Sequence, residues 1–171
     1  MKKETYDKML EKAQKYTHII QIMSRALTLL VMLFYVIVVL FGAIGKIFDT
    51  QELATVIFVP AVVFVCITVF RHVVNRPRPY EKFQRQPLIP KETHGKSFPS
   101  RHVGSAAVIG ITVCMATPFF CLGISLLFAT AIMAVLRVIS GVHFISDVLA
   151  GYFVGVIGGI LGMLLMHVWF M

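Results

Sequence analysis

Residues 103–136 read VGSAAVIGITVCMATPFFCLGISLLFATAIMAVL and contain no charged side chain. A helix that crosses the hydrocarbon core of a bilayer needs about 20 apolar residues, so this stretch is too long for a single span. Pro118 lies near its middle, where a proline favours a break between two helices. We therefore expect a tight hairpin of two membrane-spanning helices that turns around residues 117–122.

The composition of the whole chain agrees with a membrane protein. Hydrophobic residues make up 58% of its 171 residues and charged residues 14%, and the mean hydropathy is +0.84. An average soluble domain has about 25% charged residues, so this chain has too few to cover a water-exposed surface. The net charge of +8 must then lie at the membrane faces. There it suits anionic lipid headgroups or an anionic substrate, and no nucleic acid partner is expected.

Three further apolar stretches are long enough to cross a bilayer, residues 26–44, 53–70 and 148–171. Residues 71–101 are polar and rich in Pro, Arg and Lys, which indicates an ordered loop outside the hydrocarbon core. The sequence therefore predicts an all-α fold, a polytopic bundle of about five transmembrane helices.

Residues 1–25 are charged and have apolar side chains at helical spacing, among them Tyr6, Leu10 and Ala13. We expect an amphipathic helix on the bilayer surface, followed by a membrane domain over residues 26–171. A solvated helical extension of the first span is equally consistent with this pattern.

The last span carries Gly151, Gly155 and Gly159, an overlapping GxxxG pattern that lets helices approach closely. Tight packing inside the bundle is favoured over a dimer interface, and the sequence leaves the oligomeric state open.

Counting spans places most polar side chains on one membrane face. Residues 71–101, the start of the hairpin and residues 137–147 share that face, whereas residues 45–52 and 117–122 lie on the other. The shared face carries these cations and imidazoles: Arg71, Arg76, Arg78, Arg101, Arg137, His72, His94, His102 and His143. Because guanidinium groups bind phosphate oxygens in pairs, the cluster indicates a phosphate site. A positive loop against anionic lipids is the alternative.

Three spaced motifs favour the phosphate site. They are Arg71-x6-Arg78-Pro79, Pro99-Ser100-Arg101-His102 and Arg137-x5-His143-x3-Asp147. In order and spacing they resemble the type 2 phosphatidic acid phosphatase (PAP2) superfamily, whose membrane lipid phosphatases share a core with vanadium haloperoxidases. The resemblance covers about residues 50–165. The chain departs from the family pattern by Arg71 for Lys, Arg101 for Gly and Leu136 for Ser, and by one span fewer at the N-terminal side.

The resemblance implies three catalytic residues. His143 would attack phosphorus and form a phosphohistidine, and Asp147 would fix the tautomer of that imidazole. His102 would act as general acid and then as general base. Asp147 could instead cap the last span, and His102 could anchor a span end at the interface.

The resemblance also implies a phosphate-binding set, which consists of Arg71, Arg78, Ser100, Arg101 and Arg137. Backbone amides at the start of a helix near Arg101 would add donors. Carboxylates are too few for a Mg²⁺ site and no Cys/His spacing fits Zn²⁺, so no metal and no cofactor are expected.

The predicted function is a metal-independent, multi-pass membrane phosphatase acting on a lipid phosphate or diphosphate in the cell membrane. Undecaprenyl diphosphate, phosphatidylglycerol phosphate, phosphatidic acid and lipid A phosphates all fit. A non-catalytic protein that binds or moves lipid headgroups is the alternative, and a vanadate-dependent peroxidase is disfavoured. The positive-inside rule places the site toward the cytoplasm, whereas the resemblance favours the outer face.

Overall fold

The protein is a bundle of helices. Its structure is a computed structural model, which describes residues 2–45, 47–118 and 120–170. Within these ranges every regular element is helical, which confirms the predicted all-α fold. The helices are α1 (Lys3–Gln14), α2 (Thr17–Ile44), α3 (Thr50–Val74), α4 (Pro79–Phe83), α5 (Arg101–Ala116), α6 (Phe120–Ile139) and α7 (Ile145–Phe170).

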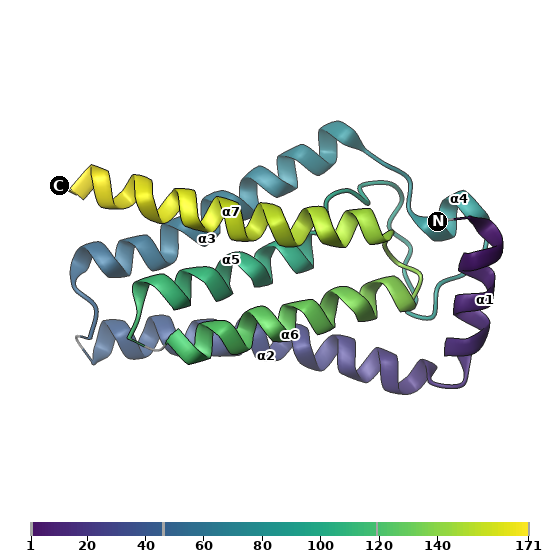
Figure 1. Ribbon diagram of the computed structural model, residues 1–171, viewed down its shortest axis with the longest axis horizontal. Coiled ribbons are helices and arrows are strands. Elements are labelled where there is room, and N and C mark those ends of the chain that lie inside the picture. Colours follow the sequence, from purple (N-terminus) through teal and green to yellow (C-terminus); the bar gives the residue numbers. More distant parts are fainter. Residues whose placement is uncertain (1, 46, 119, 171) are drawn as a thin grey trace.

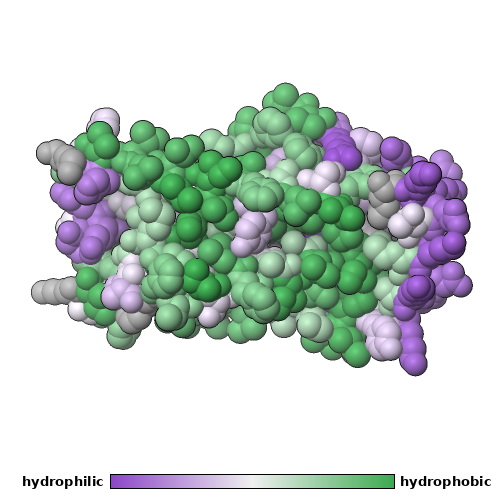
Figure 2. Space-filling view, viewed as in Figure 1, coloured by the Kyte–Doolittle hydropathy of each residue, from purple (hydrophilic) through white to green (hydrophobic). Residues whose placement is uncertain are grey.

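Four of these helices, α2, α3, α6 and α7, are long and apolar enough to cross a membrane. Helix α5 is apolar but shorter, with 16 residues, so the four long helices and α5 together are roughly consistent with the predicted count of about five. Large apolar side chains such as Leu29, Phe128 and Leu165 are exposed on the outside of the bundle. Figure 2 shows this apolar belt between two hydrophilic ends. The protein is therefore a multi-pass membrane protein.

Helix α5 is the central helix of the bundle and packs against α3, α6 and α7 (Figure 1). Most of its side chains are buried, from Val103 to Cys114. It forms the predicted hairpin with α6. Its first residues, Arg101 and His102, consequently lie between neighbouring helices at one end of the bundle.

Helix α7 packs closely against α5 through its glycines. A Cβ atom on Gly155 would lie 2.4 Å from the backbone oxygen of Gly104, and one on Gly151 would lie 2.6 Å from that of Ser100. Gly159 faces the side chain of Ile111 in the same way. The glycines thus serve packing inside the bundle, as the sequence indicated.

Helix α3 is longer than the predicted residues 53–70. Asp49 and Glu52 form a capping box at its start, with the Glu52 N–H donating to Asp49 Oδ1 at 2.7 Å. The helix ends at Val74, followed by Asn75 in a left-handed conformation. Arg71 therefore stands in the last helical turn rather than in the following loop.

The N-terminal segment differs from the expectation of one surface helix over residues 1–25. Helix α1 ends at Gln14 and the membrane helix α2 already begins at Thr17, because the apolar pattern of the first span continues toward the N-terminus. The apolar residues Tyr6, Leu10 and Ala13 of α1 are buried against other parts of the protein. Tyr6 packs on Phe83 with ring centroids 5.1 Å apart.

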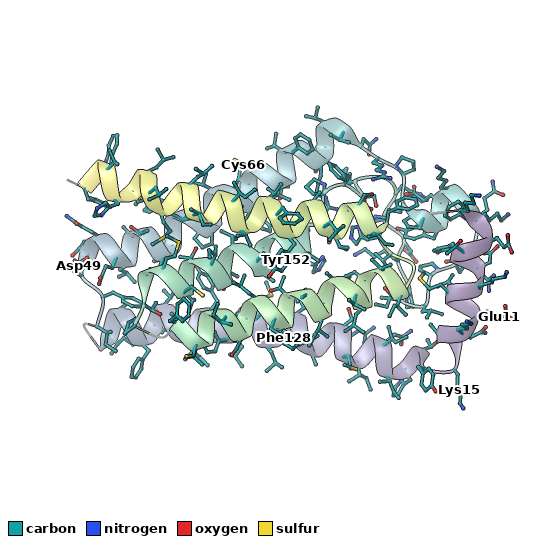
Figure 3. The ribbon with its side chains drawn as sticks, viewed as in Figure 1. Glu11, Lys15, Asp49, Cys66, Phe128 and Tyr152 are labelled. Atoms are coloured by element: carbon teal, nitrogen blue, oxygen red, sulfur yellow. The ribbon has the colours of Figure 1, made fainter. Side chains whose placement is uncertain are left out.

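The polar segments gather at one end of the molecule. Helix α1, helix α4 and the loop before α5 all lie there (Figure 1). Asp49 lies at the opposite end from Glu11 and Lys15 (Figure 3). This arrangement agrees with the predicted one-sided placement of the polar chemistry, and we call this end the polar end.

The contact between α5 and α7 generates a prediction about stability. Substituting Gly155→Ala places a methyl group against the Gly104 backbone, which cannot move without shifting a helix, so we expect destabilisation of about 1–3 kcal/mol. Thermal unfolding in detergent, followed by size-exclusion chromatography, measures the effect. Gly158→Ala is the control, because its Cβ meets the Val63 side chain at 3.0 Å. Equal losses in the two variants would contradict the proposed backbone contact.

Candidate active site

A polar cavity of about 220 Å³ lies at the polar end. It brings together side chains from α3, the loop before α5, the start of α5 and the segment between α6 and α7. The residues that line it are Thr68, Arg71, His72, Arg78, Lys91, Thr93, Lys96, Arg101, His102 and His143. Among the described residues no carboxylate lines this cavity, so its charge is strongly positive.

His143 is buried in the short connection between α6 and α7. The backbone N–H groups of Val142 and His143 both donate to the carbonyl oxygen of Arg137, at 3.2 and 3.3 Å. Gly141 has a φ of +78°, a conformation that favours glycine and allows the tight turn. The connection therefore holds the imidazole in a defined position at the cavity wall.

The Asp147 carboxylate lies behind the His143 ring. Its Oδ2 is 3.5 Å from His143 Nδ1 and accepts a hydrogen bond from Ser97 Oγ. Ser97 Oγ is itself 3.5 Å from His143 Nδ1. With Nδ1 facing this polar pair, Nε2 is the nitrogen left for the cavity.

Asp147 also organises the backbone around it. Its Oδ2 accepts a hydrogen bond from the N–H of Phe144 at 2.9 Å, and its Oδ1 accepts one from Arg76 Nη1 at 2.8 Å. It is the third residue of α7 and satisfies the N–H of the residue before the helix, as in a capping box. Asp147 thus stabilises the start of α7 and also contacts His143.

Burial sets the charge state of His143. Loss of solvation lowers its pKa to about 4, although the nearby Asp147 carboxylate opposes this effect. The imidazole is therefore neutral at neutral pH, with a free lone pair on the nitrogen that is not protonated.

Two buried arginines of the cavity are held by carbonyl oxygens of the loop before α5. Arg71 Nη2 donates to the oxygen of Lys96, and Arg78 Nε donates to that of Gly95 at 3.0 Å. Within the described residues, Nη1 of Arg78 is buried without a hydrogen-bond partner. Fixed guanidinium groups with donors to spare, beside a neutral imidazole, favour the binding of an anion with several oxygens.

Arg137 and Ser100 lie close to the cavity but do not line it. Arg137 is buried, its Nη2 is 3.4 Å from Thr28 Oγ1, and it interacts electrostatically with Arg78 and His102. Ser100 is also buried, and its backbone N–H donates to the carbonyl oxygen of Asp147 at 2.8 Å. The hydroxyl of Ser100 has no partner among the described residues.

The second imidazole, His102, lies in the first turn of α5 and lines the same cavity. Over the described parts of the chain neither of its ring nitrogens is hydrogen-bonded, so both are available to a ligand. Arg101 lines the same cavity, with its guanidinium carbon 5.2 Å from the centroid of the Phe64 ring.

Several site residues were not in the predicted set. Ser97 contacts Asp147, and Arg76 pairs with it, while Lys91 and Lys96 add charge to the cavity. Arg76 lies inside the first motif, and Ser97 lies two residues before Pro99 of the second motif. Their closeness to these motifs is the sequence signal that could have identified them as site residues. His72 also lines the cavity, whereas His94 is exposed and pairs with Glu81 at 3.2 Å.

Comparison with known proteins identifies the same region. The model of the PAP2 superfamily matches residues 50–171. No curated protein sequence shows significant similarity to the chain.

Two solved structures share the fold. One is a transmembrane PAP2-type phosphatidylglycerolphosphate phosphatase from Bacillus subtilis, with 22% identity and a TM-score of 0.72 over 95% of this chain and 83% of that one. The other is LpxE from Aquifex aeolicus, with 21% identity and a TM-score of 0.60 over 85% and 93%. The matched range contains all three motifs and every residue of the cavity, and the chain belongs to the PAP2 superfamily.

Proposed function

We propose that this protein is a metal-independent membrane phosphatase that hydrolyses a lipid phosphate or diphosphate through a phosphohistidine. One observation carries the proposal. A buried, neutral His143, with Asp147 behind it, faces a cavity that is lined by several cations and, among the described residues, by no carboxylate. This combination provides a nucleophile and a binding site for the phosphoryl group that it attacks.

In the first step, His143 Nε2 attacks phosphorus and the bond from phosphorus to the leaving oxygen breaks. Arg71 and Arg78 neutralise the charge on the phosphoryl oxygens in the transition state. His102, which lines the same cavity, acts in its protonated imidazolium form: it donates a proton to the leaving oxygen and becomes neutral. Asp147 stabilises the positive charge that develops on the imidazole of His143.

In the second step, His102 removes a proton from a water molecule, which attacks the phosphohistidine. The bond from phosphorus to nitrogen breaks, inorganic phosphate leaves and His143 returns to its neutral form. Because Lys91, Lys96 and the arginines surround the cavity, no metal ion is needed to balance the phosphate charge. Such a lining also repels a free divalent cation.

The position of the cavity supports a lipid substrate. It lies where the membrane helices meet the polar end, so a substrate can keep its tail in the bilayer while its phosphate reaches His143. The similar structure from Bacillus subtilis is that of a phosphatidylglycerolphosphate phosphatase, which supports the same substrate class. Undecaprenyl diphosphate, phosphatidylglycerol phosphate and phosphatidic acid fit this description, and the cell membrane is the proposed location.

The first prediction concerns the nucleophile. His143→Ala should lower kcat for release of phosphate from a detergent-dispersed lipid phosphate by about 10³-fold or more, because the covalent route is lost. The wild-type protein should also yield an acid-labile, base-stable phosphoenzyme that the variant lacks. His18→Ala removes an exposed histidine of α2 and is the matched control. Phosphate release that persists unchanged in His143→Ala favours a non-catalytic role for this site.

The second prediction concerns pH. Since the pKa of His143 is about 4, below the ordinary value of about 6.5, the imidazole becomes a nucleophile as pH rises through about 4. We expect the acidic limb of kcat/KM near that value.

The same shift affects stability. The unfolded chain binds more protons than the folded one between these two pKa values, so stability falls as pH is lowered through this range. The free energy of unfolding and kcat/KM are both measured across this pH range. An acidic limb of kcat/KM near 6.5, with no change in stability over the same range, contradicts the assignment.

The third prediction concerns metals and vanadate. Hydrolysis should continue in excess EDTA, because cationic side chains rather than a metal neutralise the phosphate. Orthovanadate, which adopts the geometry of the phosphoryl transition state, should inhibit competitively. Steady-state assays with each additive test both statements, and a strict requirement for added Mg²⁺ would count against the mechanism.

A further inference from the structure

A second, larger cavity adjoins the cationic one. Its volume is about 540 Å³, and it lies between α2, α3, α5 and α6. Most of its lining is apolar, and includes Val31, Met32, Val36, Ile57, Phe64 and Met133. Among the described residues only Arg101 and His102 line both cavities. The two residues therefore mark the passage from an apolar space to the phosphate site.

Arg101 has no anionic partner in the described parts of the chain. Its guanidinium carbon lies 5.2 Å from the centroid of the Phe64 ring, a cation–π contact that orients the group and leaves its N–H donors free. Arg76, by contrast, is paired with Asp147, and Arg85 is paired with Asp7. An oriented guanidinium without a counterion, at the border of an apolar cavity, favours an anionic group at that position.

The order of the cavities determines which part of a lipid would meet Arg101. With the tail in the apolar cavity and the reacting phosphoryl group at His143, the segment between them passes Arg101 and His102. In a lipid monophosphate this segment is an uncharged ester. In a lipid diphosphate it is a second phosphate group.

We propose that Arg101 binds the phosphate next to the lipid tail and thereby makes the site selective for lipid diphosphates over lipid monophosphates. This inference rests on the phosphatase function proposed above. It names the diphosphate as the substrate class and Arg101 as the residue that determines the choice.

The charge of the polar cavity supports this assignment. Arg71, Arg78, Lys91, Lys96 and Arg101 line it, and no carboxylate does so within the described residues. Burial, and secondarily the positive charge of Arg78, lowers the pKa of Lys91, which indicates a crowded cationic site. A diphosphate carries more negative charge than a monophosphate and neutralises such a site more completely.

The reaction of a diphosphate balances with the same groups. His143 Nε2 bonds to the terminal phosphorus, and the bond from that phosphorus to the bridging oxygen breaks. The electron pair stays on the bridging oxygen, so the leaving group is a lipid monophosphate beside Arg101. Water then releases inorganic phosphate from the phosphohistidine, and Arg101 stabilises the charge of the leaving group throughout.

The test uses two probes with the same tail, farnesyl diphosphate and farnesyl monophosphate, on the full-length protein in detergent. The measured quantity is the ratio of kcat/KM for the diphosphate to that for the monophosphate. Arg101→Gln should lower this ratio about tenfold or more, because a charge-assisted contact to only one substrate is lost. Arg101→Lys, which keeps the charge but not the planar fork, should retain part of the ratio.

Lys82→Gln is the matched control, since Lys82 is an exposed cation of the polar end that lines neither cavity. It should leave the ratio unchanged. If Arg101→Gln lowers kcat/KM equally for both probes, Arg101 attracts anions without reading the second phosphate. That outcome overturns the inference while the phosphatase function stands.

If the wild-type protein hydrolyses neither probe, the proposed function fails, and the inference is tested by binding instead. Calorimetric titration of each probe onto the wild-type and Arg101→Gln proteins gives the two dissociation constants. A selective loss of diphosphate affinity in the variant supports the inference. An unchanged ratio of affinities overturns it.

Discussion

The polar end of this protein depends on one buried carboxylate. Asp147 accepts hydrogen bonds from Ser97, Arg76 and the backbone of Phe144, and it faces Nδ1 of His143. These partners come from the loop after α3, the loop before α5 and the connection before α7. A buried carboxylate is stable only when its oxygens are paired, so the same contacts that satisfy Asp147 also hold these segments together.

Helix packing brings the carboxylate to the place where it is needed. The glycines of α7 allow its backbone to lie against α5, and the contact of Gly151 with Ser100 is the one nearest the site. There the N–H of Ser100 donates to the carbonyl oxygen of Asp147 at 2.8 Å. The start of α5, with its adjacent His102, is thereby fixed beside the start of α7. Small residues deep in the membrane region thus position imidazoles at its edge.

The membrane environment separates the two tasks of the site. Apolar side chains line a cavity between α2, α3, α5 and α6, and cations line the cavity at the polar end. In the function we propose, the first holds a lipid tail and the second its phosphate. Helix α1 covers part of that end, where Tyr6 donates a hydrogen bond to the carbonyl oxygen of Gly141 at 3.2 Å. This contact connects the N-terminal helix to the turn that carries His143, so α1 belongs to the support of the site.

The sequence by itself determined the membrane helices, the hairpin and the three motifs, because these depend on hydropathy and on spacing within single segments. The short spacing between His143, in the connection before α7, and Asp147, in its first turn, is such a local property. Only the tertiary structure decided three other features. These are the pairing of Arg76 with Asp147, the hydrogen bond from Ser97 to Asp147 and the packing of α1 against the protein. They join segments far apart in the chain, and such contacts follow from helix packing. The direction of Arg101, toward Phe64 and the border of two cavities, was decided in the same way.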